Sequence, residues 1–168
     1  MKAIIKIIFL CGIIVLTAFS CEKEKPETIA FLVELVNNNN VMIDSFEKDD
    51  SVFFNYYLTN NMGREVSYVR PKGEILNFLK VFKQNFEGEY EYIGKPSAFF
   101  SGLPIIKKID DNETKLISSV LFIASAQFTS EFNWPEMNSG NYYVGDTLKL
   151  TINNERYHFE SRLYFKIK

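Results

Sequence analysis

The stretch SVFFNYYLT, residues 51–59, decides the fold class. Its side chains alternate strictly, so that successive residues point to opposite faces of an extended chain. One face carries Val52, Phe54, Tyr56 and Leu58, and the other carries Phe53, Asn55, Tyr57 and Thr59. Aromatic and β-branched side chains favour a pleated, half-buried surface. The stretch is therefore predicted to be a β-strand.

A second alternating run follows this strand after a short polar segment. Residues 60–63 supply turn-forming side chains, and residues 65–69 alternate again with Val66 and Tyr68 on one side. Two alternating runs separated by a few turn residues are typical of a β-hairpin. We expect 51–59 and 65–69 to pair with each other.

The rest of the chain gives further strand signals at spacings of about ten residues. We predict strands at 28–36, 41–46, 90–93, 105–109, 114–128, 141–144, 148–152 and 157–167. The 105–109 strand is expected at a sheet edge, and 114–128 at a sheet centre because few of its positions are charged. Turns are expected at the asparagine run 37–40 and at Asn153–Asn154, with a long connection between sheets at 94–103.

Residues 75–86 give conflicting signals. One face of a helix would carry Ile75, Leu79, Phe82 and Phe86. Leu76, Phe78 and Phe82 also sit at the even spacing of a strand. The segment is followed by a turn at 87–89 and then by an alternating run, so a strand, turn, strand unit is favoured over a helix.

Many short strands joined by polar turns indicate a two-sheet sandwich more than a barrel. The composition agrees, since 16 phenylalanines and 9 tyrosines accompany few alanines. The fold class expected is all-β, with a single domain over residues 28–168.

The N-terminal segment predicts where the domain resides. Lys2 and Lys6 precede an apolar run at 7–19, which is too short to span a bilayer but suits a signal peptide. Residues 16–21, LTAFSC, end this run at Cys21. Cys11 lies inside the run, so Cys21 would be the only cysteine left after cleavage.

This site resembles the lipobox of bacterial lipoproteins, in the relaxed form seen in Bacteroidota. The resemblance implies a signal peptide over 1–20, lipidation at Cys21, a charged tether over 21–27 and attachment to the outer membrane, with the periplasmic and cell-surface leaflets both open. Ordinary secretion with cleavage near Ser20, or an uncleaved membrane anchor, are the alternatives.

The order of motifs along the domain also looks like an immunoglobulin-like accessory sandwich. The motifs are DSV at 50–52, LTNN at 58–61, FLKVF at 78–82, YIG at 92–94, FNW at 132–134 and SGNYYV at 139–144. Such modules occur in bacterial envelope proteins and beside some secreted peptidases. The resemblance implies an immunoglobulin-like antiparallel β-sandwich but no particular activity. The antibody-type Cys…Trp…Cys framework is missing.

Charge and motif content argue against several functions. Without Lys2 and Lys6, 17 basic side chains stand against 21 acidic ones, so nucleic acid is an unexpected partner. One histidine, His158, and no usable cysteine pair leave no zinc ligand set. Acidic clusters at 49–50 and 110–113 are oxygen-rich, but solvated turns are preferred over calcium sites. No cofactor, no metal and no enzymatic activity are expected.

Recognition is the remaining role for exposed side chains. Four aromatic residues flank one loop, where they would stack on a sugar or pack on a protein unless they belong to the core: Phe132, Trp134, Tyr142 and Tyr143. Ser51 and Thr147 lie in D-[ST]-aliphatic motifs that resemble O-glycosylation sites of Bacteroidota envelope proteins.

The sequence thus favours a non-catalytic, lipid-anchored envelope lipoprotein that acts as a binding or assembly module with a protein or glycan partner. The alternative is an accessory lipoprotein subunit of a secretion or surface-uptake complex. A glycan-active hydrolase is a third hypothesis, since a pair of catalytic carboxylates cannot be recognised from sequence.

Overall fold

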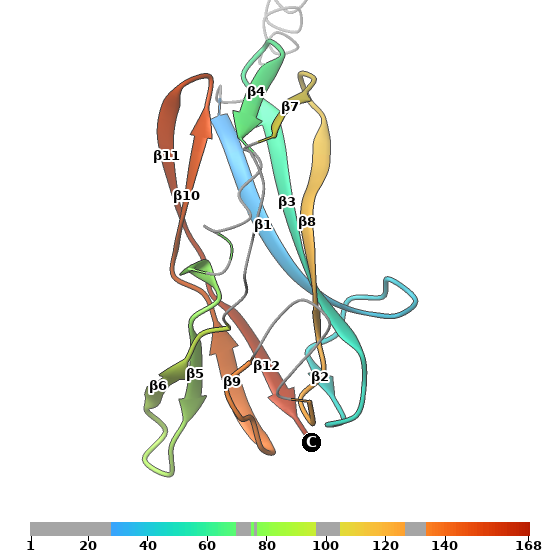
Figure 1. Ribbon diagram of the computed structural model, residues 1–168, viewed down its shortest axis with the longest axis vertical. Helices are drawn as coiled ribbons and strands as arrows, with labels where there is room; N and C mark the ends of the chain where they lie inside the picture. The colour runs from blue at the N-terminus through green and yellow to red at the C-terminus, as the bar shows by residue number, and fades with distance from the viewer. Residues whose placement is uncertain (1–27, 70–74, 76, 97–104, 127–133) are drawn as a thin grey trace, which may run out of the picture.

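The computed structural model describes residues 28–69, 75, 77–96, 105–126 and 134–168, which form twelve β-strands in three hydrogen-bonded sheets (Figure 1). The three-stranded sheet has the order β1 (Thr28–Asn37), β3 (Val52–Asn61), β8 (Thr114–Phe122). The four-stranded sheet has the order β11 (Glu155–Glu160), β10 (Thr147–Ile152), β4 (Val66–Val69), β7 (Ile106–Ile109). The five-stranded sheet has the order β2 (Ser45–Phe46), β12 (Leu163–Ile167), β9 (Gly140–Val144), β5 (Val81–Gln84), β6 (Tyr90–Gly94).

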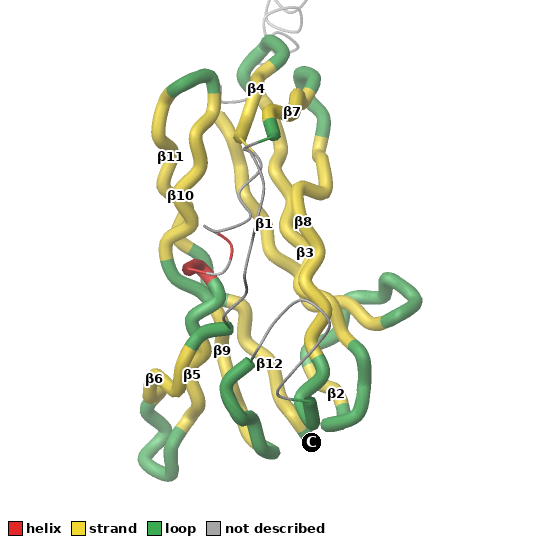
Figure 2. The backbone as a smooth tube through the Cα atoms, in the orientation of Figure 1, coloured by secondary structure: helices red, strands yellow, loops and turns green. Residues whose placement is uncertain are grey.

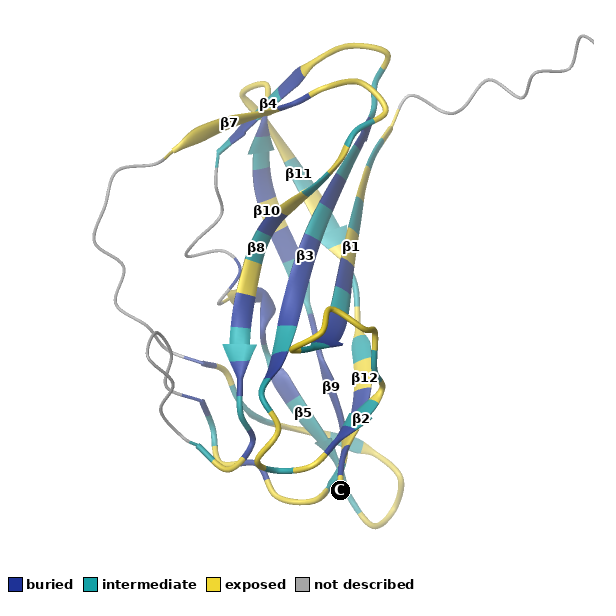
Figure 3. Cartoon of the chain, turned by 90° about the vertical axis from the view of Figure 1, so that its right-hand side faces the viewer, coloured by how far each residue is buried: buried dark blue, intermediate teal, exposed yellow. Residues whose placement is uncertain are grey.

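Strand β3 is the centre of the three-stranded sheet. It pairs antiparallel with β1 over its full length and with β8 on its other side. The residues predicted to share one face, Val52, Phe54, Tyr56 and Leu58, are all fully buried. On the other face Phe53, Tyr57 and Thr59 are half-buried and Asn55 is buried, so β3 shows the predicted alternation except at Asn55 (Figure 3). The all-β prediction is confirmed as well.

The opposite layer is built on one long hairpin. Strands β9 and β10 run in succession, strands β11 and β12 return alongside them, and Asn153 and Asn154 make the turn with φ values of 48° and 67°. The ribbon is interrupted at Gly145–Asp146 and at Ser161–Arg162. One half of the hairpin therefore serves the four-stranded sheet and the other half serves the five-stranded sheet (Figure 1).

The core lies between the two layers and is rich in aromatic rings. Phe54 of β3 and Phe122 of β8 contact Phe165 of β12, with ring centroids 5.9 and 6.4 Å apart. Near the other end, Phe31 of β1 meets Phe159 of β11 at 5.6 Å. These contacts join the sheets face to face, which is the arrangement of a β-sandwich. The strand pairs are antiparallel except for β2 with β12, which is parallel.

The predicted hairpin between residues 51–59 and 65–69 is wrong. Strand β3 lies in the three-stranded sheet, whereas β4 pairs with β10 and β7 in the other layer. The buried side chain of Asn60 organises this crossing, because its amide donates to the carbonyls of Arg64 and Ile109 at 2.7 and 3.1 Å and its oxygen accepts from the Met62 amide. The turn residues after β3 therefore redirect the chain between layers.

The position of the 114–128 strand also differs from the prediction. Strand β8 ends at Phe122 and lies at the edge of its sheet, while β3 takes the centre. Lys115 is the one charged side chain in β8, and this low charge made the segment resemble a central strand. The predicted edge position of 105–109 is confirmed by β7, which ends the four-stranded sheet.

The ambiguous segment 75–86 contains both kinds of structure. A helical turn includes Ile75, Asn77 and Phe78, and the Leu79 amide donates to the Ile75 carbonyl at 3.0 Å (Figure 2). Strand β5 begins at Val81 and forms a hairpin with β6, so the favoured strand, turn, strand unit is confirmed for its second part.

Substitution Gly145→Ala is expected to destabilise the protein strongly. Gly145 has a φ of 144°, which side chains rarely adopt, and an added Cβ would lie 2.1 Å from the Ser161 carbonyl oxygen. We expect the free energy of unfolding, measured by urea denaturation, to fall by about 3 kcal/mol.

Gly63→Ala is the matched control. Gly63 also has a positive φ, 68°, but an added Cβ would meet nothing within 4 Å, so a loss of only about 1 kcal/mol is expected. Equal losses in the two variants would contradict the close approach at Gly145.

Candidate functional site

The outward face of the five-stranded sheet carries a group of aromatic side chains. We call Phe82, Tyr90, Tyr92, Tyr143 and Tyr164 the outer aromatic cluster. They come from the four neighbouring strands β5, β6, β9 and β12. Within the strands, their neighbours Val81, Val144 and Phe165 are buried in the core, so alternation turns the cluster away from it.

The strand register places these side chains in two adjacent rows. The aromatic row runs Tyr164, Tyr143, Phe82, Tyr92 across the four strands. The polar row lies two residues away on each strand, on the same side of the aromatic row, and runs Lys166, Asn141, Gln84, Tyr90. The Asn141 amide donates to Gln84 Oε1 at 2.9 Å, which joins the middle of the polar row.

Tyr143 is the centre of the cluster. Its ring stacks on Phe82 with centroids 4.4 Å apart, and it contacts Tyr90 at 5.0 Å and Tyr164 at 5.4 Å. These neighbours leave Tyr143 only 7% exposed, whereas Tyr92 and Tyr164 at the ends of the aromatic row are 55% and 52% exposed. Solvated aromatic area is therefore concentrated at the two ends.

Positive charge accompanies the cluster. The guanidinium of Arg162 lies over the Tyr143 ring, 5.2 Å from its centroid, and hydrogen bonding to Tyr164 raises the pKa of Arg162. Arg162, immediately before β12, and Tyr164 and Lys166 of β12 are all exposed. A cation held over a ring keeps much of its hydrogen-bonding capacity, because a guanidinium has five N–H donors.

The four aromatic residues predicted to take part in recognition lie in different parts of the structure. Phe132 lies outside the described residues. Trp134 and Tyr142 are 3% and 1% exposed and belong to the core, where Trp134 contacts Phe122 and Tyr142 stacks on Phe165. Only Tyr143 belongs to the outer aromatic cluster.

The other cluster residues were not singled out from the sequence. Tyr90, Tyr92 and Tyr164 occupy outward positions of strands that the alternation does identify. The missing information was the strand order, because residues 82, 92, 143 and 164 become neighbours only through non-local pairing.

A salt bridge fixes the site to the bend of the long hairpin. Lys80, just before β5, pairs with Asp146 between β9 and β10, and the Gly145 amide donates to the Lys80 carbonyl at 3.1 Å. The hydrogen bond from Lys80 lowers the pKa of Asp146 and raises that of Lys80.

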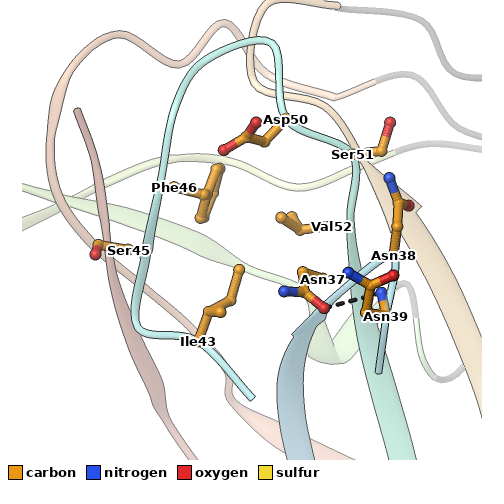
Figure 4. Close-up of a pocket in the computed structure, with 9 residues that line it drawn as sticks. All are labelled: Asn37, Asn38, Asn39, Ile43, Ser45, Phe46, Asp50, Ser51 and Val52. Carbon is orange, nitrogen blue, oxygen red and sulfur yellow. Dashed lines mark hydrogen bonds between the residues drawn. The ribbon is translucent and has the colours of Figure 1, made fainter. Parts of the chain in front are cut away.

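A cavity of about 360 Å³ lies elsewhere, beside the asparagine run (Figure 4). Two of its polar side chains serve the local turns. Asn37 Oδ1 accepts from the Asn39 and Val41 amides, and Asp50 Oδ2 accepts from the Glu47 amide. The bonds to Asn37 match the turn predicted at 37–40.

Ser51 lines this cavity, and Thr147 begins β10 next to the paired Asp146. Both side chains are half-buried. O-glycosylation at Ser51 and Thr147 stays a prediction.

The described residues contain no cluster of three or more His, Cys, Asp or Glu side chains suited to a metal ion. In the 110–113 turn, Asp111 accepts from the Gly63 amide and Glu113 from the Asp110 amide. His158 is exposed on β11. Burial raises the pKa of Tyr56 well above its usual value, but this ring lies inside the core.

None of the helical structure within the described residues is long and apolar enough to cross a membrane.

Asp146→Asn tests the salt bridge through its pH dependence. Because the pKa of Asp146 is lowered in the fold, its contribution to stability is complete above the unfolded-state pKa and is lost as the pH falls through the folded-state pKa. We expect the variant to be less stable than the parent at pH 7 and the two unfolding curves to converge in acid.

Asp49→Asn removes the same charge from an exposed turn residue that forms no ion pair among the described residues. It should leave the pH profile of stability close to that of the parent. An equal effect of both substitutions would show that net charge, not the pair with Lys80, is responsible.

No protein-family model matches this sequence, and no curated protein matches it either.

Proposed function

We propose that this protein is a non-catalytic, lipid-anchored envelope lipoprotein whose β-sandwich acts as a binding module. The observation that carries the proposal is the outer aromatic cluster, whose exposed rings lie beside side-chain amides and cations on one sheet face. Buried cores account for most aromatic residues of soluble domains, so outward tyrosines gathered from several strands favour recognition.

The position of the cluster suits a tethered binder. Strand β1 begins at Thr28 at one end of the sandwich, and β5, β6, β9 and β12 lie at the opposite end (Figure 1). A lipid on Cys21 followed by the tether at 21–27 would hold the Thr28 end toward the membrane. The cluster would then face away from the bilayer, where a large ligand has access.

Replacing Cys21 tests the anchor. In a bacterial host that processes lipoproteins, the full chain is expected to incorporate an alkyne-labelled fatty acid and to fractionate with the outer membrane. Cys21→Ala should lose the label, because the thioether can no longer form. The readouts are in-gel fluorescence and mass spectrometry of the N-terminal peptide.

Cys11→Ala is the matched control and should keep the label, since this cysteine lies in the segment removed by cleavage. A free thiol on Cys21 in the native protein, or label retained in Cys21→Ala, would overturn the anchored placement.

A second candidate, an accessory subunit of a secretion or surface-uptake complex, is favoured by the other layer. On the outward face of the three-stranded sheet, Leu32, Tyr57 and Leu116 are in register across β1, β3 and β8. Leu32 and Leu116 are 52% and 49% exposed. A solvated apolar row of this kind suits a protein interface.

The two candidates predict different behaviour on purification from detergent-solubilised outer membrane. If the apolar row is an interface, a stoichiometric protein partner accompanies the chain and is lost from the double variant Leu32→Ser, Leu116→Ser. The control Tyr164→Ala should retain the partner. A chain that purifies alone would contradict the second candidate.

A further inference from the structure

We infer that the outer aromatic cluster binds an acidic polysaccharide laid across strands β12, β9, β5 and β6. The inference rests on the proposed binding role and specifies its ligand. It is carried by the juxtaposition of the aromatic row, the polar row and two unneutralised cations.

The aromatic row has the length and exposure for an oligosaccharide. The strands cross three interstrand steps of ~4.8 Å, about 14 Å in all, which exceeds one sugar ring. The Tyr90 ring lies against Tyr143 and Tyr164, with centroids 5.0 and 5.8 Å away, and is part of the same aromatic surface. The C–H groups on a pyranose face are apolar and slightly positive, so they stack on the negative face of an aromatic ring. Tyr164 and Tyr92 offer exposed ring surface at the two ends, while Tyr143 and Phe82 support them from between.

The polar row supplies hydrogen-bonding groups beside these rings. Asn141 Nδ2 donates to Gln84 Oε1, and Gln84 Nε2 donates to the Gly88 carbonyl at 3.0 Å. Each of these two amide nitrogens has two N–H groups and uses one of them in these bonds, so the second N–H of each can donate to a ligand. Fixed amides adjacent to aromatic rings match a ligand that presents an apolar face and a rim of hydroxyl groups.

Charge complementarity selects an acidic sugar. Arg162, immediately before β12, and Lys166, within it, flank Tyr164 along the chain. Both are exposed, and neither forms an ion pair with a carboxylate in the described part of the chain. The outward strand positions in both rows hold no Asp or Glu, although the whole chain carries a formal net charge of −2. A guanidinium matches the fork of a carboxylate, so uronic acid units would supply the missing partners.

Nucleic acid is a poorer occupant. Its affinity comes mainly from neutralising many successive phosphates, and two cations on an acidic protein provide little of that. A neutral glycan would use both rows but would leave Arg162 and Lys166 without a carboxylate partner.

The test uses the full-length chain in detergent micelles and measures Kd by calorimetry. The probes are polygalacturonate, alginate and hyaluronate, each with its methyl-esterified counterpart. At least one acidic polymer should bind, its ester should bind about tenfold more weakly, and added salt should weaken the acidic polymer selectively.

Two double variants separate stacking from charge. Tyr92→Ala with Tyr164→Ala should weaken the acidic polymer and its ester alike, by about tenfold or more. Arg162→Gln with Lys166→Gln should reduce the affinity for the acidic polymer to that for the ester. The controls Leu116→Ser and Lys107→Gln change exposed residues on other sheets and should bind as the parent does.

Failure to bind any acidic polymer, equal affinity for acid and ester, or tighter binding of single-stranded DNA would overturn the inference. None of these results affects labelling of Cys21 or co-purification of a partner. Those two measurements therefore test the proposed anchored binding module independently of the sugar ligand.

Discussion

The structure depends on aromatic packing between the two layers, centred on Phe165. Its ring contacts Phe46, Phe54 and Tyr142 at centroid distances between 5.7 and 5.9 Å. Because side chains alternate along a strand, holding Phe165 and Tyr142 in the core forces Tyr164 and Tyr143 outward. The same contacts that stabilise the sandwich therefore also create the outer aromatic cluster.

The bend of the long hairpin completes this arrangement. At Gly145 the ribbon passes from one sheet to the next. The hydrogen bond from the Gly145 amide to the Lys80 carbonyl and the ion pair of Lys80 with Asp146 hold the start of β5 against this bend. Phe82 follows two residues later, so its ring is brought beside Tyr143. Both partners of the salt bridge are partly exposed, and such pairs contribute more to geometry than to stability.

The sequence identified most strands because the core faces alternate clearly, as in β3, and because asparagine suits the left-handed residues of the 153–154 turn. It did not predict strand order. The β3–β4 crossing depends on where the Asn60 side chain finds carbonyl partners, and one of these, Ile109, lies far along the chain. The adjacent Tyr142 and Tyr143 show the same limit: alternation sends them to opposite faces, but only the contact with Phe165 decides which one is inside.

The ladder between β1 and β3 has a mechanical consequence. Its ten register pairs run antiparallel from Thr28 to Asn37, with Thr28 at the end remote from β12. In the proposed anchored state, tension between the membrane and a ligand held on β12 would pull β1 lengthwise along β3. Such loading shears the hydrogen bonds between β1 and β3 together instead of breaking them one at a time. The domain is therefore expected to resist a pulling force applied through its bound ligand.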